Sequence, residues 1–177
     1  MSSQTPDNVP LIEKWDQLLE GKVTVITGGG GGIGRGISEL FAAHGAIVEI
    51  AEIDTDRARE TVNEITKNGG QARAHTIDVR DESDVSRFRD EVAKKHGRVD
   101  VLVNNVGDYR PLVRFLDSSP DSWKEMYGIN LHHVFLVTHV FLQLMIDGGG
   151  GSIINVHSVE GMRGYPGDPV YGAMKAA

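Results

Sequence analysis

Residues 22–53 read KVTVITGGGGGIGRGISELFAAHGAIVEIAEI, and this stretch decides the fold. Its β-branched start, residues 23–27, predicts a strand. A glycine run follows, and then apolar side chains at helical spacing predict an amphipathic helix: Ile33, Ile37, Leu40 and Phe41. The helix is expected to stop at Gly45, because glycine adopts the left-handed turn that ends helices. A second strand is predicted over residues 47–53, which completes a βαβ unit.

The alternation of strands and helices continues along the chain. Helices are predicted at about 56–68, 82–96 and 120–146, and strands at 72–79, 99–104 and 153–156, before a last helical fragment. Strands that are apolar on both faces and alternate with helices form parallel sheets with right-handed crossovers. The predicted fold class is therefore α/β, a doubly wound parallel sheet of the Rossmann type with three α/β/α layers, over residues 21–177. Residues 1–20 are predicted to be an N-terminal extension with a short amphipathic helix.

The composition excludes several classes of function. The 177 residues carry a formal net charge of −7, which gives no electrostatic footprint for nucleic acid. There is no cysteine, and the seven histidines lack metal-ligand spacing, so neither disulfides nor a metal site is expected. The N-terminus has no signal-peptide pattern, and the longest apolar stretch, residues 134–146, is shorter than the ~20 residues of a membrane span. We expect a cytoplasmic protein without a membrane or nucleic-acid partner.

The glycine run lies where a phosphate-binding turn is expected, between a strand and a helix. Glycines let backbone N–H groups approach a pyrophosphate at the positive end of a helix. Two related dinucleotide patterns fit the run: the general fingerprint at Gly29, Gly31 and Gly34, and the TGxxxGxG variant at Thr27, Gly28, Gly32 and Gly34. A P-loop requires Lys and then Ser or Thr after the last glycine, but Arg35 and Gly36 follow here. The run therefore predicts dinucleotide binding.

Glu52 stands at the end of the second strand, about 20 residues past the glycines. An acidic residue there accepts hydrogen bonds from the adenosine ribose hydroxyls of NAD and repels the additional phosphate of NADP. Asp54 is the alternative candidate, because it points the same way in a strand. No Lys or Arg lies within the glycine run or just beyond Glu52. NAD is therefore favoured over NADP.

Three further motifs lie in the distal half. Asn104-Asn-Val-Gly107 ends the fourth strand, Ser158 ends the fifth, and Tyr171-Gly-Ala-Met-Lys175 follows thirteen residues later. Together with TGxxxGxG, these motifs resemble the short-chain dehydrogenase/reductase family, whose members interconvert alcohols and carbonyls with NAD(P). The family's NNAG motif is NNVG here, with Val106 in place of alanine, and Glu52 stands where aspartate is commoner.

The resemblance implies a set of functional residues. The cofactor-binding residues implied are Gly28, Gly32, Ile33, Gly34, Glu52, Asp78, Val79, Asn105, Gly107, Tyr171 and Lys175. The implied catalytic residues are Asn130, Ser158, Tyr171 and Lys175. Tyr171 would act as general acid and base, Ser158 would donate a hydrogen bond to the substrate oxygen, and Asn130 would hold a water that relays protons. Lys175 shares a helix face with Tyr171, so its ammonium stabilises the phenolate and would also bond the nicotinamide ribose.

The resemblance also implies a small-molecule alcohol or ketone as substrate. The charged loop residues Glu160, Arg163 and Asp168 hint at a polar ligand mouth. The helix at 120–146 is apolar on more than one face, which predicts a homo-oligomer for the complete enzyme.

The chain ends in a helix at Lys175, whereas the resembling family continues with two strands and a substrate-covering loop. We therefore expect a C-terminally truncated chain whose last strands are missing, whose fifth strand is an exposed apolar edge, and which is inactive alone. The alternative to the oxidoreductase is thus a non-catalytic nucleotide-binding fragment of such an enzyme.

Overall fold

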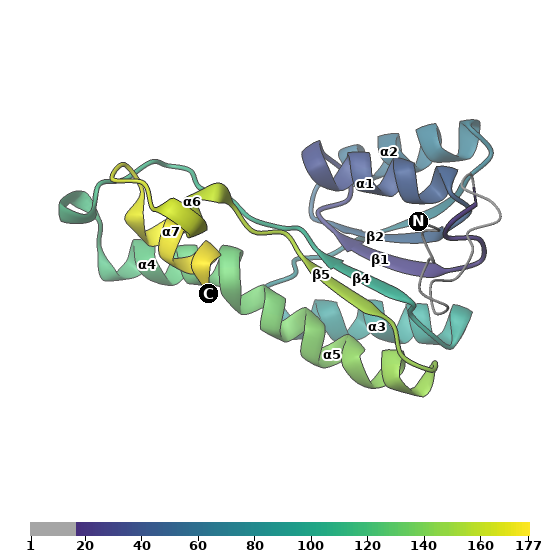
Figure 1. Ribbon diagram of the computed structural model, residues 1–177. Helices are drawn as coiled ribbons and strands as arrows, with labels where there is room; N and C mark the ends of the chain where they lie inside the picture. Colours follow the sequence, from purple (N-terminus) through teal and green to yellow (C-terminus); the bar gives the residue numbers. More distant parts are fainter. Residues whose placement is uncertain (1–16) are drawn as a thin grey trace, which may run out of the picture.

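The computed structural model describes residues 17–177, so most of the predicted N-terminal extension lies outside the described residues. Five parallel strands form one sheet in the order β3-β2-β1-β4-β5 (Figure 1). The strands are β1 (Val23–Thr27), β2 (Ile47–Glu52), β3 (Gln71–Thr76), β4 (Val101–Asn104) and β5 (Ser152–Asn155). The helices are α1 (Gly32–Ala43), α2 (Thr55–Lys67), α3 (Glu82–His96), α4 (Pro120–Tyr127), α5 (His133–Asp147), α6 (Val159–Arg163) and α7 (Pro169–Ala176). Two short turns complete the set, the 3-10 turn η1 (Phe115–Asp117) and the π-helical turn η2 (Gly128–His132). The predicted α/β class is confirmed.

Helices cover both faces of the sheet, α1 and α2 on one side and α3 and α5 on the other (Figure 1). The central strand β1 is buried along its whole length, as expected for a strand covered on both faces. On the α1 and α2 side, the core contains Ile26, Val48 and Ile50. On the α3 and α5 side, Phe88 and Phe141 pack edge to face with their ring centroids 5.3 Å apart. The two cores give the three layers.

The side of α1 that meets the sheet differs in part from the prediction. Ile37 and Phe41 pack against the core as expected. Ile33 and Leu40 are 68% and 57% exposed, whereas Gly34, Ser38 and Ala42 are buried. Small residues are needed there because α1 lies directly on the glycine turn. The Ser38 hydroxyl lies only 2.9 Å from the position that a Cβ at Gly29 would occupy. The residues at this contact are selected by the short distance between α1 and the glycine turn, and not by the apolar area that they bury.

Two of the predicted elements differ in the structure, and a third has its predicted extent but an internal irregularity. β3 ends at Thr76 rather than at residue 79, because the Asp78 N–H donates to the Asp84 carboxylate (3.0 Å) instead of to a strand neighbour. The last helical fragment is two helices, α6 and α7. The predicted helix at 120–146 is continuous from α4 to α5 but contains the π-helical turn η2, a feature that is frequent at functional sites.

The helix from Pro120 to Asp147 is long and apolar enough, by length and composition alone, to cross a membrane. In this fold, its α5 part lies against α3 and buries Val137, Phe141 and Met145, as a core helix does. Its other side leaves Phe135, Leu142 and Ile146 exposed. The homo-oligomer expected from this surface stays a prediction. As expected, β5 is an apolar edge strand, with half-exposed isoleucines at positions 153 and 154.

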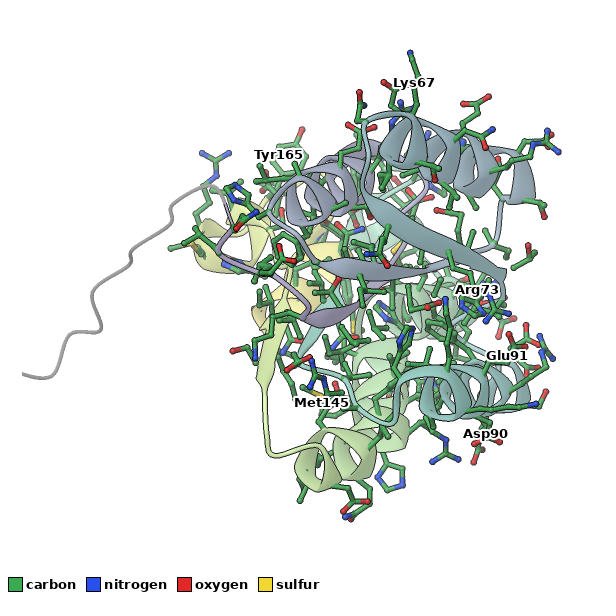
Figure 2. The ribbon with its side chains drawn as sticks, turned by 90° about the vertical axis from the view of Figure 1, so that its right-hand side faces the viewer. Lys67, Arg73, Asp90, Glu91, Met145 and Tyr165 are labelled. Carbon is green, nitrogen blue, oxygen red and sulfur yellow. The ribbon has the colours of Figure 1, made fainter. Side chains whose placement is uncertain are left out.

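A charged cluster lies between the sheet and α3, away from the glycine turn. The Glu49 carboxylate of β2 is fully buried and contacts His75 Nε2 at 2.6 Å and His96 Nε2 at 2.7 Å. Lys95 Nζ donates to it at 3.2 Å. Burial by itself would raise the pKa of Glu49, but these three hydrogen bonds outweigh it and lower the pKa from 4.5 to about 2. Arg73 and Glu91 pair at 2.8 Å at the edge of this cluster, where β3 faces α3 (Figure 2).

We expect Glu49→Gln to lower the free energy of unfolding at pH 7 by about 3 kcal/mol, the linkage energy of the shift from 4.5 to about 2. Because the folded-state pKa is depressed, this stabilisation is present above pH 4.5 and is lost as the pH falls towards 2. Urea unfolding of both proteins at pH 7 and at pH 3 measures the loss of unfolding free energy and its dependence on pH. Glu91→Gln is the matched control, since Glu91 contacts the same His75 (3.2 Å) from a 41% exposed position and should change stability by less than about 1 kcal/mol. A Glu49 variant as mild as this control would contradict the account.

Candidate active site

A groove runs along the carboxyl ends of β1, β2 and β4, the edge at which open α/β sheets bind ligands. Most of the predicted cofactor residues line it: Gly28, Gly32, Ile33, Glu52, Asp78, Val79, Asn105 and Gly107. Gly34 lies beneath the groove, and Tyr171 and Lys175 line neighbouring pockets. The exposed Ile33 at the start of α1 is thus part of a groove wall rather than of the core.

The glycine turn needs glycine at two positions in particular. Gly28 has φ +64°, a conformation that other residues rarely adopt, and its N–H donates to the Ala51 carbonyl at 2.7 Å. A Cβ at Gly34 would lie 2.1 Å from the Gly28 carbonyl oxygen and 2.6 Å from Asn105 Nδ2. The Asn105 amide in turn donates to the Thr27 carbonyl at 2.9 Å. Asn105 therefore fixes the shape of the turn from β4.

The N-terminus of α1 differs from those of the next two helices. Asp54 caps α2 and Asp81 caps α3 through their side chains. In contrast, α1 begins after Gly31 with no side-chain cap and no acidic residue in its first turn. The first N–H groups of a helix lack partners within the helix and carry a partial positive charge. With the bare glycine backbone beside them, these groups form a cradle that fits the pyrophosphate of a dinucleotide.

Glu52 is held against the glycine turn. Its Oε2 accepts from the Gly30 N–H at 3.1 Å, and its Oε1 accepts from the N–H groups of Ile53 (3.0 Å) and Asp54 (3.1 Å). The side chain lines the groove where the adenosine ribose would lie. Asp54, the alternative candidate, does not line the groove, because its carboxylate caps α2 by accepting from Asp56 and Arg57.

Sequence reasoning missed a basic residue in this groove. Arg57 lies in the first turn of α2, and its Nη1 is 3.7 Å from the position of a Cβ at Gly31. It pairs with Asp54 at 3.2 Å. A basic side chain therefore does lie close to the glycine turn, although none stands directly after Glu52 in the sequence. The signal that could have revealed it is the helix start at Asp54, because side chains in the first turn of a helix point back toward its N-terminus.

Asp78 follows β3 on the other side of the groove. Arg80 binds its carboxylate through the backbone N–H (3.0 Å) and the guanidinium. The hydrogen bond from the Arg80 side chain is the largest cause that lowers the pKa of Asp78, so this carboxylate is ionised at neutral pH. Val79 is buried beside it.

Ser158 and Tyr171 line one pocket. The lobe that contains α4, α6 and α7 lies beyond the carboxyl ends of β4 and β5 (Figure 1). The Ser158 Oγ caps α6 by accepting from the Glu160 N–H at 3.3 Å, which leaves its own proton to donate. The Tyr171 ring packs edge to face on Tyr109, with centroids 6.1 Å apart. Among residues 17–177, no hydrogen bond joins the Tyr171 hydroxyl to Ser158 or to Lys175.

Asn130 and Lys175 line a second pocket on the other side of α7. Asn130 is buried in η2, where its Nδ2 donates to the Asp108 carbonyl (2.8 Å) and its Oδ1 accepts from the Asp108 N–H (3.1 Å). Lys175 Nζ donates to the Val156 carbonyl at 3.2 Å, and burial lowers its pKa. A Cβ at Gly107 would lie 2.7 Å from Lys175 Nζ and 3.0 Å from Asn130 Oδ1. Gly107 therefore connects this pair to the groove that it also lines.

The structure thus places the predicted residues in a groove and two adjoining pockets, rather than in one cavity. Sequence reasoning missed His133, which is fully buried at the start of α5. Burial, and then the charge of Lys175, lower the pKa of His133 to about 4. The His133 imidazole is therefore neutral at pH 7 and adds no positive charge to that of Lys175.

Together the fold and the groove define a Rossmann-type protein with a dinucleotide-binding edge. The sequence profile described as short chain dehydrogenase matches residues 22–177. The chain belongs to the short-chain dehydrogenase family, a family of NAD(P)-dependent oxidoreductases.

Individual relatives agree with this assignment. The chain is 39% identical over 160 residues to a 3-oxoacyl-[acyl-carrier-protein] reductase of Thermotoga maritima, covering 89% of this chain and 64% of that protein. It is 38% identical to a sorbitol dehydrogenase of Cereibacter sphaeroides, covering 90% and 61%. Among solved structures, a 7α-hydroxysteroid dehydrogenase in complex with NADH and 7-oxo-glycochenodeoxycholic acid superposes with a TM-score of 0.85 at 34% identity, covering 91% of this chain and 62% of that one. A metagenomic short-chain oxidoreductase in complex with NADP gives a TM-score of 0.84 at 32% identity, covering 89% and 71%. The chain therefore spans just under two thirds of the length of the two curated relatives.

Proposed function

We propose that this protein transfers a hydride between NAD(H) and an alcohol or ketone, with Tyr171 as the general acid and base. The observation that carries the proposal is the position of Ser158 and Tyr171 in one pocket, with Gly107 linking Lys175 to the dinucleotide groove. The nicotinamide supplies the hydride chemistry when it is bound. The glycine turn, the uncapped end of α1 and Glu52 would hold the cofactor.

Each residue of the site has a separate role in this proposal. Ser158 donates its hydroxyl proton to the substrate oxygen, because its Oγ is held as an acceptor of the Glu160 N–H and its proton stays free. Tyr171 gives a proton to that oxygen in reduction and takes it in oxidation. The Lys175 ammonium stabilises the phenolate of Tyr171 from the same helix, and Asn130 holds the Asp108 backbone against η2. Asn130 thus acts as a positioning residue as well as a candidate for the proton relay.

We propose NAD as the preferred cofactor, because the Glu52 carboxylate lines the groove and would repel the additional phosphate of NADP. Arg57 lies in the same groove but is paired with Asp54, which reduces its attraction for a phosphate.

Glu52→Gln is expected to reduce the preference for NAD over NADP, measured as the ratio of their dissociation constants, by about tenfold. Arg57→Ala is expected to increase this preference by a smaller factor. Glu52→Gln keeps one acceptor, which can serve either the Gly30 N–H or the N–H groups of Ile53 and Asp54, so the ratio of the two constants is the readout rather than either affinity alone. Fluorescence titration with NADH and NADPH measures both ratios. Arg59→Ala is the matched control on the same helix, since Arg59 does not line the groove and, within residues 17–177, its ion pair is with Asp56. Tighter NADPH than NADH binding by the unsubstituted chain would contradict the proposal.

A second candidate function is dinucleotide binding without turnover by these 177 residues. It is favoured by one observation, that Ser158 with Tyr171 and Asn130 with Lys175 line separate pockets. Measuring NADH oxidation against a panel of ketones, in parallel with NADH binding, separates the two functions. Binding without oxidation supports the second candidate, and oxidation with any ketone supports the first.

A further inference from the structure

The pocket that contains Ser158 and Tyr171 carries two carboxylates among its hydrogen-bond acceptors. It is lined by three tyrosines, one leucine, the serine and two carboxylates: Tyr109, Tyr165, Tyr171, Leu112, Ser158, Glu160 and Asp168. Neither the family motifs nor the proposed hydride transfer requires the two carboxylates. Their environment indicates what the pocket recognises.

Asp168 is the more deeply buried of the two, at 3% exposure. Its Oδ1 caps α7 by accepting from the Tyr171 N–H at 3.3 Å. Its Oδ2 is also buried, yet among the described residues it has no hydrogen-bond partner. A buried carboxylate oxygen without a partner is costly, so a ligand that supplies a donor gains the energy that the protein leaves unused.

Glu160 repeats this arrangement from α6. Its Oε2 is buried without a hydrogen-bond partner among the described residues, whereas Oε1 lies 3.5 Å from Arg163 Nη2. The Arg163 guanidinium therefore compensates the charge of Glu160 but leaves one acceptor open. Glu160 stands two residues after Ser158, and Asp168 three residues before Tyr171.

Close packing of α6 on α7 brings these two acceptors to the same pocket. A Cβ at Gly172 would lie 3.1 Å from the Glu160 carbonyl oxygen, and a Cβ at Gly161 would lie 2.6 Å from the Lys175 carbonyl oxygen. Because both helices approach through glycines, the side chains that flank the two proposed catalytic hydroxyls lie on the walls of one pocket.

We propose that Asp168 and Glu160 select substrates that carry a hydroxyl or ammonium donor next to the reacting carbon, and disfavour substrates with a carboxylate there. The inference rests on the proposed function, since it assigns the substrate class of the same site. Two carboxylate oxygens accept from neutral hydroxyls and from cations alike, and the tyrosine rings provide apolar faces for either. A substrate carboxylate would supply no donor to the open oxygens of Asp168 and Glu160, and it would find Arg163 already paired with Glu160.

Three probes with one skeleton and one secondary alcohol test this directly: 1,2-propanediol, protonated 1-amino-2-propanol and lactate. Binding to the 177-residue chain is followed by ligand-observed NMR, both with saturating NADH and without it. The diol and the amino alcohol are expected to bind about tenfold more tightly than lactate. Similar affinities for the diol and the amino alcohol would indicate that the pocket recognises a hydrogen-bond donor. Tighter binding of the amino alcohol would indicate that it recognises a cation. Both results support the proposal.

Asp168→Asn and Glu160→Gln are the diagnostic variants. Asp168→Asn keeps one oxygen to cap α7 and replaces the open acceptor with a donor, so the preference for the diol over lactate should shrink by about tenfold. Glu160→Gln makes the same change without touching a helix cap. Asp81→Asn, which alters the cap of α3 outside the pocket, is the matched control and should leave the preference unchanged.

Lactate binding as tight as that of the diol, or a preference that survives both diagnostic variants, would overturn the inference. Failure of NADH to bind would overturn the proposed function instead. Because the probes are also titrated without NADH, the preference for donors is decided separately from that outcome.

Discussion

Tyr171→Phe is expected to reduce turnover by about two to four orders of magnitude, the usual contribution of a general acid or base, while NAD(H) binds with nearly unchanged affinity. The substitution removes only the hydroxyl, so the ring can keep its edge-to-face contact with Tyr109. Ser158 and the groove stay in place, because no hydrogen bond in the described part of the chain joins them to the Tyr171 side chain. Turnover is measured at saturating cofactor in the form of the protein that shows activity, and affinity on the chain itself.

Two further variants make this result specific. Tyr165→Phe removes a hydroxyl from the same pocket without touching the proposed chemistry, and should retain most of the activity. Lys175→Ala should reduce both turnover and NAD(H) affinity, since its ammonium lies against Gly107 in the wall of the groove. If Tyr171→Phe kept activity close to that of Tyr165→Phe, the proton would be transferred by another group.

Gly34→Ala is expected to lower the free energy of unfolding by about 1–3 kcal/mol, as overpacking in a well-packed site does, and to weaken NAD(H) binding by at least about tenfold. The new methyl group would lie 2.1 Å from the Gly28 carbonyl oxygen, so either the turn opens or α1 moves away from it. Both changes displace the backbone N–H groups that form the cradle for the pyrophosphate.

Gly36→Ala is the matched control for this variant, two residues farther along α1. A Cβ at Gly36 would meet nothing within 4 Å, and its position in α1 is exposed. Replacing an exposed helical glycine with alanine should raise stability by up to about 1 kcal/mol and leave binding unchanged. Equal effects of the two variants on NAD(H) affinity would show that the close approach of Gly34 to the turn has no part in binding.

The sequence predicted the fold well where two independent signals agreed. β1, the glycine run and β2 combine apolar strands with a turn that only glycine can form, and the structure places them at the centre of the sheet. The face of α1 was misjudged because Ile33 and Leu40 follow helical spacing, whereas contact with the glycine turn requires the smaller Gly34 and Ser38. The spacing of apolar residues indicates which helix face is hydrophobic, but it does not indicate how closely the helix approaches its neighbour.

The residues predicted for the site stay a prediction, and their arrangement in a groove and two pockets could not be foreseen. Ser158 and Tyr171 do share a pocket, yet the π-helical turn that buries Asn130 has no signal in the spacing of apolar residues. Arg57 was missed because a side chain three residues past a helix cap turns back toward the preceding loop, and sequence separation does not show this. The open acceptors of Asp168 and Glu160 depend on the packing of α6 against α7, which only the three-dimensional structure reveals.

Isothermal titration of NAD⁺ into the 177-residue chain tests the central claim most directly, that the glycine turn and the uncapped end of α1 form a dinucleotide site. The account predicts saturable binding of one NAD⁺ per chain, retained in Gly36→Ala and strongly weakened in Gly34→Ala. Absence of saturable binding at millimolar NAD⁺, or binding that Gly34→Ala leaves unchanged, would contradict it.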